Sequence, residues 1–257
     1  SARRPRWPAT RRRAARRWSC AGSPATGWPC SPPTPSAVAL GRVEPARASA
    51  WSHLSQLLRM RGRLAESDLA ARRALAADAF LDDAADIRHR LFFIALWRGD
   101  YAQARDACDR GRAQFPADFR FTECALTLLR NDRSRPSDPA AAWRLVAELE
   151  RLYPPTRARA QNHAYTPIYH RMVAAAVSAR AGDADSARAV AARARREVGT
   201  NPELGPSLDY DEAWVRVMLG DTAGARALIE RAARSQPAFR EYLMRDPLVR
   251  SLSRPGG

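Results

Sequence analysis

The chain has 257 residues and a formal net charge of +16, and all 43 of its basic residues are Arg. This length can bury one large hydrophobic core or two ordinary ones, and no apolar run approaches the roughly 18 residues that cross a membrane, so we expect no membrane span. The exclusive use of Arg beside abundant Ala is typical of a GC-rich genome, so the charge alone does not identify a partner. Because the chain starts with Ser, we expect a fragment or a processed product.

Residues 1–47 differ from the rest of the chain. Residues 1–50 contain ten Arg and one Glu, a net charge of +9, which leaves +7 for all the other residues. Prolines interrupt any helical or alternating period here, so we predict disorder or an irregular extended path. A shifted reading frame of GC-rich DNA is an alternative origin, because it tends to encode Arg, Pro, Ser, Trp and Cys together. We therefore place the start of the folded part at residue 48.

A recurring pattern of small residues begins after that boundary. Four times, a Gly is followed by a small residue after five positions and by another after seven more. The four copies are Gly62, Ser67 and Ala74; Gly99, Ala104 and Gly111; Gly182, Ala187 and Ala194; and Gly220, Ala225 and Ala232. In three copies Asp follows the Gly directly. A recurring helix–turn–helix unit predicts a stack of repeats rather than a single globular core.

Helical periodicity places the elements in chain order. It predicts five helix pairs, over residues 50–61 and 64–77, 86–98 and 101–114, 119–129 and 139–153, 167–181 and 184–198, and 210–219 and 223–235. Asp138 and Pro139 form a good helix start, whereas the loop over residues 131–137 makes the third pair the least regular. Residues 239–257 are expected to form a capping helix, broken near Pro247, and a tail. No segment after residue 48 alternates polar and apolar residues, so we predict an all-α fold with a repeat domain over residues 48–238.

The side chains that could bind a metal or take part in catalysis form no recognisable site. The four cysteines have no C-x-x-C spacing, and we expect Cys108 and Cys124 to be small buried residues on helices. His163 and His170 lack a Cys or acidic neighbour at ligand spacing, and the cluster Asp82, Asp83 and Asp86 fits a helix start. No phosphate-binding, nucleophile or metal motif occurs. We therefore predict no metal, no cofactor and no enzymatic activity.

The repeat unit resembles the tetratricopeptide repeat. Its signature is W-x2-L-G-x2-Y, then A-x3-F, then Pro. The matching residues are Trp51, Leu54, Leu58, Ser67 and Ala71 in the first unit; Leu91, Phe92, Ala95, Ala104, Cys108 and Pro116 in the second; and Ala213, Ala225, Ile229 and Pro237 in the fifth. The resemblance covers roughly residues 48–238 and implies a right-handed α-solenoid of about five antiparallel helix pairs. Residues 242–248 look like the ends of such domains in large bacterial regulatory proteins.

The resemblance also implies where a partner binds. In tetratricopeptide folds the first helix of each pair lines a concave groove. The corresponding residues here are Ser52, Gln56, Arg59, His89, Arg90, Phe93, Trp97, Tyr169, Met172, Tyr210 and Trp214. Aromatic rings and Arg would suit an extended peptide or an amphipathic helix, with Arg anchoring carboxylates. Alternatively, Phe93 and Trp97 belong to the core between repeats.

These observations lead to one main functional hypothesis and one alternative. We expect a non-catalytic, cytoplasmic protein–protein interaction scaffold that binds a peptide or a partner domain, as the C-terminal part of a larger bacterial regulator. The alternative is nucleic-acid binding through residues 1–47, because Arg neutralises phosphates and Trp stacks on bases. It is less well supported, since those Arg lie outside the repeat domain.

Overall fold

The computed structural model describes residues 45–78, 83–160, 163–236, 243 and 246–252. The chain divides into two units, residues 1–43 and residues 44–257, and the described residues all belong to the second unit. The predictions for residues 1–44, 79–82, 161–162, 237–242, 244–245 and 253–257 lie outside the described residues. The expected tail is among them, as are six residues of the segment 239–252 from which a capping helix was predicted; the described part of that segment contains a short helix that begins at Pro247.

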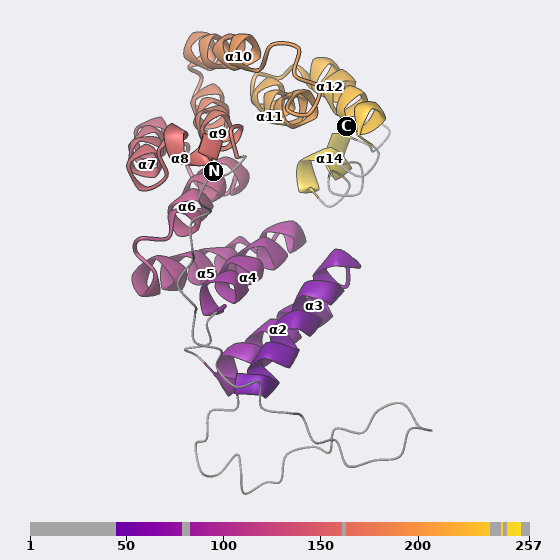
Figure 1. Cartoon of the computed structure of the whole chain (residues 1–257). Helices are drawn as coiled ribbons and strands as arrows, with labels where there is room; N and C mark the ends of the chain where they lie inside the picture. Colours follow the sequence, from indigo (N-terminus) through magenta and orange to yellow (C-terminus); the bar gives the residue numbers. More distant parts are fainter. Residues whose placement is uncertain (1–44, 79–82, 161–162, 237–242, 244–245, 253–257) are drawn as a thin grey trace, which may run out of the picture. The chain divides into compact units, whose positions relative to one another are not determined.

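The described residues form twelve helices and no strand. They are α2 (Pro45–Met60), α3 (Leu64–Ala77), α4 (Ala84–Arg98), α5 (Tyr101–Gln114), α6 (Phe119–Asn131), α7 (Pro139–Leu152), α8 (Pro155–Ala160), α9 (Thr166–Arg180), α10 (Ala184–Val198), α11 (Gly205–Met218), α12 (Thr222–Ser235) and α14 (Pro247–Leu252). The helices pack in consecutive pairs, from α2 and α3 in indigo to α11 and α12 in orange and yellow (Figure 1). The all-α prediction is confirmed for this part of the chain.

The helices of the five pairs lie within two residues of their expected bounds, except at the starts of α2 and α11. Helices α2 and α11 each begin five residues before their predicted starts, at Pro45 and Gly205. Helix α8 was not predicted, because Pro154 and Pro155 follow α7 and a pair of prolines typically marks the end of a helix. Proline fits the first turn of a helix, where its missing N–H is not needed, so Pro155 both follows one helix and opens the next.

The recurring Gly-Asp pair has a direct conformational cause. Gly99, Gly182 and Gly220 have φ angles of 74°, 92° and 82°, in the left-handed region that glycine tolerates at the end of a helix. The Asp that follows each Gly is the N-cap of the next helix. Its carboxylate accepts from the backbone N–H of Gln103, Ser186 or Gly224, at 3.0, 3.2 and 2.8 Å. At Gly62 the next residue is Arg63, and that cap makes no such bond.

The small residues of the pattern let helices approach closely. The two small residues that follow the Gly are buried in all four copies. Ser67 Oγ of α3 lies 3.1 Å from Ser55 Oγ of α2 and donates to the carbonyl of Ser55 at 2.7 Å. A Cβ on Gly111 of α5 would lie 2.1 Å from the ring of Phe121 in α6. Small residues therefore set contacts within a pair and also between successive pairs.

The apolar core forms a succession of clusters along the chain rather than a single centre. One cluster joins α3 and α4, a second joins α4, α5 and α6, and a third joins α6, α7 and α9. The largest joins α9 to α12 with residues of the C-terminal segment, including Leu243, Leu248, Val249 and Leu252. Each pair therefore stabilises the next.

The prediction for Cys108 and Cys124 was incomplete. Both are buried on helices, as expected, but they form a disulfide with a Cα–Cα distance of 5.9 Å. The bond links α5 of the second pair to α6 of the third. A separation of 16 residues is no recognised motif, so only the packing of these two helices brings the sulfurs together.

Candidate functional site

Side chains from the first helices of three successive pairs surround one pocket. It has a volume of about 330 Å³ and lies among α2, α4 and α6. Its lining residues are Gln56, Arg59, Asp86, His89, Arg90, Phe93 and Arg120. Five of these seven were predicted from the repeat pattern. The lining contains three Arg and one acid, a net charge of +2 when His89 is neutral.

Arg90 is held in place by backbone rather than by a carboxylate. Its Nη1 donates to the carbonyl oxygen of Ser52 at 2.8 Å. Ser52 Oγ in turn donates to Asp83 at the start of α4. Burial, and after it the nearby charge of Arg59, lower the pKa of Arg90 below its usual value. Two guanidinium groups therefore face one pocket and repel each other, an arrangement that a bound anion would relieve.

Aromatic rings form one wall of the pocket. The ring of His89 meets Phe93 edge to face with centroids 4.8 Å apart, and Phe93 packs against Trp97 at 5.7 Å. Arg59 lies over the Trp97 ring at 5.7 Å, and its Nε donates to Gln56 Oε1 at 3.2 Å. Burial is the main cause that lowers the pKa of His89, so its ring is neutral at neutral pH. His89 Nε2 is buried without a hydrogen-bond partner.

Arg120 forms the third side of the pocket and was missed by sequence reasoning. Its guanidinium binds Asp118 through Nε and Nη2, at 2.9 and 2.6 Å from the two carboxylate oxygens, and reaches Asp86 of α4 through Nη1. These carboxylates raise the pKa of Arg120 above its usual value. The irregular third unit gave no repeat position to compare, although Arg120 could have been sought on the first helix of that unit.

No protein-family model matches this chain, and no curated protein matches it either. The pocket is therefore interpreted from its own chemistry. In the described part of the chain, no group of three or more His, Cys, Asp or Glu residues is placed to hold a metal ion. None of the helices described there is long and apolar enough to cross a membrane. A basic pocket with an aromatic wall can bind a carboxylate or phosphate group next to an apolar one.

The remaining predicted residues do not line this pocket. Ser52 and Trp97 lie next to it, but only 2% and 5% of their surfaces are exposed. Met172, Tyr210 and Trp214 are buried in the largest apolar cluster, and Tyr169 packs against the cluster of α6, α7 and α9. These four were expected in the groove, and burial leaves Met172, Tyr210 and Trp214 almost no surface for a partner. The aromatic spacing on α9 and α11 reflects contacts between helices.

A buried polar network occupies the region where those residues were expected. The fully buried Arg130 of α6 lies 4.4 Å from the Trp214 ring and 5.9 Å from the Tyr169 ring. Its Nη1 donates to Asp211 Oδ1 at 3.4 Å, and Tyr165 OH donates to Oδ2 of the same carboxylate at 2.7 Å. Sequence reasoning missed Arg130, because a single Arg on an otherwise amphipathic helix suggests a solvated face.

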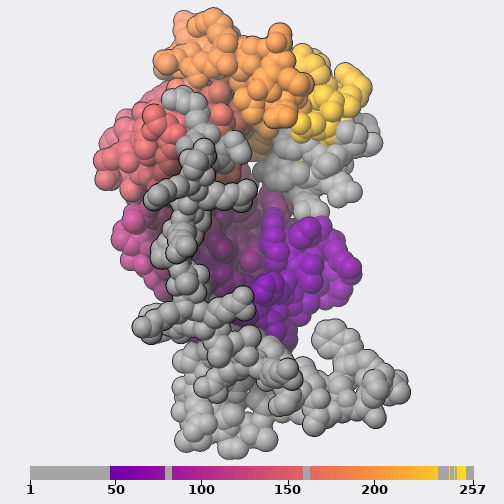
Figure 2. Space-filling view, in the orientation of Figure 1, coloured from indigo at the N-terminus to yellow at the C-terminus, as the bar shows by residue number. Residues whose placement is uncertain are grey.

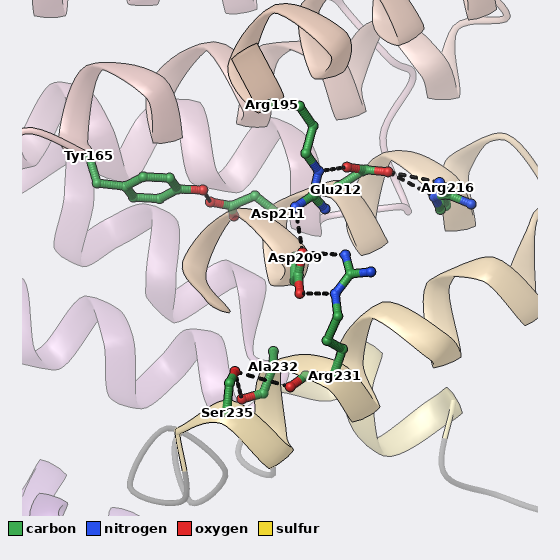
Figure 3. A network of polar contacts seen from close by, with 9 residues as sticks. All are labelled: Tyr165, Arg195, Asp209, Asp211, Glu212, Arg216, Arg231, Ala232 and Ser235. Atoms are coloured by element: carbon green, nitrogen blue, oxygen red, sulfur yellow. Dashed lines mark hydrogen bonds and ion pairs between the residues drawn. The ribbon is translucent and has the colours of Figure 1, made fainter. Parts of the chain in front are cut away.

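A second group of charges near Asp211 alternates in sign across three helices (Figure 3). Arg231 of α12 binds both oxygens of Asp209, each at 2.6 Å. Arg195 of α10 bridges Asp209 and Glu212 of α11 at 2.6 and 2.5 Å. Glu212 then accepts from Arg216 at 2.9 Å. Each carboxylate lies between two Arg, so these charges orient helices and leave little net charge for a ligand.

Proposed function

We propose that this chain is a protein-interaction module that binds an acidic, extended segment of a partner protein in the pocket among α2, α4 and α6. The proposal includes the finer architecture, a tetratricopeptide-like right-handed solenoid in which the first helices of successive pairs present the binding surface. The observation that carries it is the meeting of Arg59, Arg90 and Arg120 from three consecutive first helices around one pocket. A peptide crossing these helices could place carboxylates on the Arg side chains and an apolar side chain against Phe93.

The charge balance favours an acidic partner over a basic or neutral one. Among the described residues, Asp86 is the sole acid that lines the pocket, and it is already bound to Arg120. Arg90, whose hydrogen bonds go to Ser52, has donors suited to a second acceptor. A carboxylate there would also reduce the repulsion between Arg59 and Arg90.

The test uses the full chain and a library of labelled synthetic peptides rich in Asp and Glu, with interspersed Pro to prevent helix formation. We expect Arg90→Glu to weaken binding at least about tenfold, because it replaces an attraction with a repulsion. Arg144→Glu is the matched control: it makes the same charge change at an exposed position of α7 outside the pocket. Equal binding by both folded variants would exclude the pocket. Arg90→Lys should retain part of the affinity.

The compartment is a separate part of the hypothesis. Disulfides persist in oxidising compartments and are rare in the cytoplasm. The Cys108–Cys124 bond therefore favours an oxidising compartment over the cytoplasmic location expected from the sequence. Membership of a larger bacterial regulator stays a prediction. The nucleic-acid alternative stays one too, because it depends on residues 1–47, most of which lie outside the described residues.

A further inference from the structure

The exposed large apolar side chains of the described residues all lie on the first helix pair. They are Leu54, Leu57 and Met60 of α2 and Leu69 of α3, with 40%, 57%, 59% and 50% of their surfaces exposed. Figure 2 shows α2 and α3 in indigo. This surface is separate from the pocket, so a partner bound there would be independent of the proposed function.

The exposed leucines lie opposite the side of α2 that packs against its neighbours. Ala48, Ser52 and Ser55 are buried, and Leu54 and Leu57 lie roughly half a turn around the helix from them. On α3, Leu69 likewise lies on the side of the helix away from the buried Ala70, Ala71 and Ala74. The first pair therefore has apolar residues on two sides, and α4 and α5 cover one of them.

The opposite end of the repeat series is different. There, Leu243, Leu248, Val249 and Leu252 of the C-terminal segment are buried in the cluster that contains α11 and α12. In a stack of helix pairs each apolar face is covered by a neighbour, and terminal pairs normally carry a polar outer face. The first pair instead carries an apolar outer face. We will call the exposed side chains of Ala50, Leu54, Leu57, Arg61 and Leu69 the outer face.

Spacing and charge indicate what fits this face. Ala50, Leu54, Leu57 and Arg61 are exposed and follow one another after four, three and four residues, which is the spacing of a seam between two helices. The first pair, residues 45–77, contains six Arg and two acids, Glu66 and Asp68, and these acids are paired with Arg63 and Arg72. A second copy paired through this face would bring Arg against Arg, whereas a helix with flanking acids would be attracted.

We propose that the outer face of α2 and α3 is a second interaction surface, which binds an amphipathic helix with a leucine-rich stripe flanked by Asp or Glu. The leucines of the bound helix would interdigitate with Leu54 and Leu57, and its acids would pair with Arg61, since Arg63 is already paired with Glu66. This contact would extend the series of helices by one member.

The experiment measures binding of the full chain to a fluorescent synthetic peptide of three heptads, with Leu at the two seam positions and Glu beside them. Leu54→Ser combined with Leu57→Ser retains every Arg of the chain, so it tests the apolar contact at constant charge. We expect this variant to bind at least about tenfold more weakly. A second variant, Arg61→Glu, should weaken binding and make it less dependent on salt.

Two control peptides separate the face from general attraction to the Arg-rich chain. One has Lys in place of Glu, and the other has the same composition with Pro inserted to prevent a helix; neither should bind. Circular dichroism and the thermal midpoint establish that the variants are folded. Unchanged binding by the folded Leu54→Ser, Leu57→Ser variant would overturn the proposal. The proposal would also be overturned if the wild type sedimented as a dimer and this variant as a monomer, because the face would then bind a second copy of the chain.

Discussion

Asp211 is a carboxylate in a fully buried position, paired with the equally buried Arg130. Its pKa is raised to about 6, mainly by burial and to a lesser extent by the negative charge of Asp246, while Arg130 and the hydrogen bond from Tyr165 act in the opposite direction. Because the pKa is higher in the folded state than in the unfolded state, the folded protein holds more protons between about pH 4 and pH 6. The contribution of Asp211 to stability therefore falls as pH rises through this window.

The direction of this pH dependence can be measured with the variant Asp211→Asn, because the Asn side chain has nearly the same shape as Asp and does not titrate. The free energy of unfolding of the wild type minus that of the variant should decrease by about 2–3 kcal/mol from about pH 4 to about pH 7. Chemical denaturation of both proteins at several pH values provides the comparison, in which the other titrating groups cancel. A difference that does not vary with pH would contradict the raised pKa.

The residues that the repeat resemblance places in a groove differ in where they lie in the structure. Arg59, Arg90 and Phe93, which the resemblance places in a groove, line the pocket, whereas Ser52 and Trp97 of the same two units are buried beside it. Sequence could not assign Trp214 and Tyr210 to the groove or to the core, since aromatic residues occur in both. Their burial depends on Arg130 and Asp246, which come from distant parts of the chain.

At the scale of single elements, Gly111 shows how closely helices α5 and α6 pack. Ala favours a helix over Gly by about 1 kcal/mol, so propensity alone would make Gly111→Ala stabilising. A Cβ at this position, however, would lie 2.1 Å from two ring carbons of the buried Phe121. We expect the clash to dominate and to lower the free energy of unfolding by about 1–3 kcal/mol.

Gly205→Ala is the matched substitution. Gly205 is the first residue of α11, and a Cβ there would have no neighbouring atom within 4 Å. It should be neutral or stabilising by up to about 1 kcal/mol. Urea denaturation of the two variants separates propensity from packing. Similar changes in both would show that the ring of Phe121 moves aside without cost.

Helix bounds were the most predictable feature of the elements. Helices α3, α5 and α10 coincide with the predicted ranges, because apolar period, Gly at the helix end and Asp at the next start all act locally. The starts of α2 and α11 were predicted five residues too late, since the period of apolar residues does not reveal a first turn that contains Pro45 or Pro206.

At the scale of the whole molecule, the Cys108–Cys124 disulfide joins two successive helix pairs. Closing a loop of this length stabilises a protein by about 3 kcal/mol in the chain-entropy account. Cys108→Ala with Cys124→Ala should therefore lower the free energy of unfolding by about this amount. A reducing agent should lower the thermal midpoint of the wild type and leave that of the double variant unchanged. A thiol count on denatured protein checks the bond directly, and free thiols at both positions would contradict it.

The C-terminal segment adds contacts that no local pattern predicts. Arg250 Nη2 of α14 donates to the carbonyl oxygen of Trp97 in α4 at 3.0 Å, across 153 residues of sequence. Tyr210 OH of α11 donates to Asp246 just before α14 at 2.6 Å. The segment thus covers the last helix pair, while the first pair keeps its leucines exposed.

Sequence alone determined the helices of the five pairs and the turns between them, because helical period, Gly and Asp act over a few residues. It also named five of the seven residues that line the pocket. The disulfide, the buried Arg130–Asp211 pair and the exposed outer face were decided only by tertiary structure. Each depends on which helix lies against which, and that choice is made by shape and charge between residues far apart in the chain.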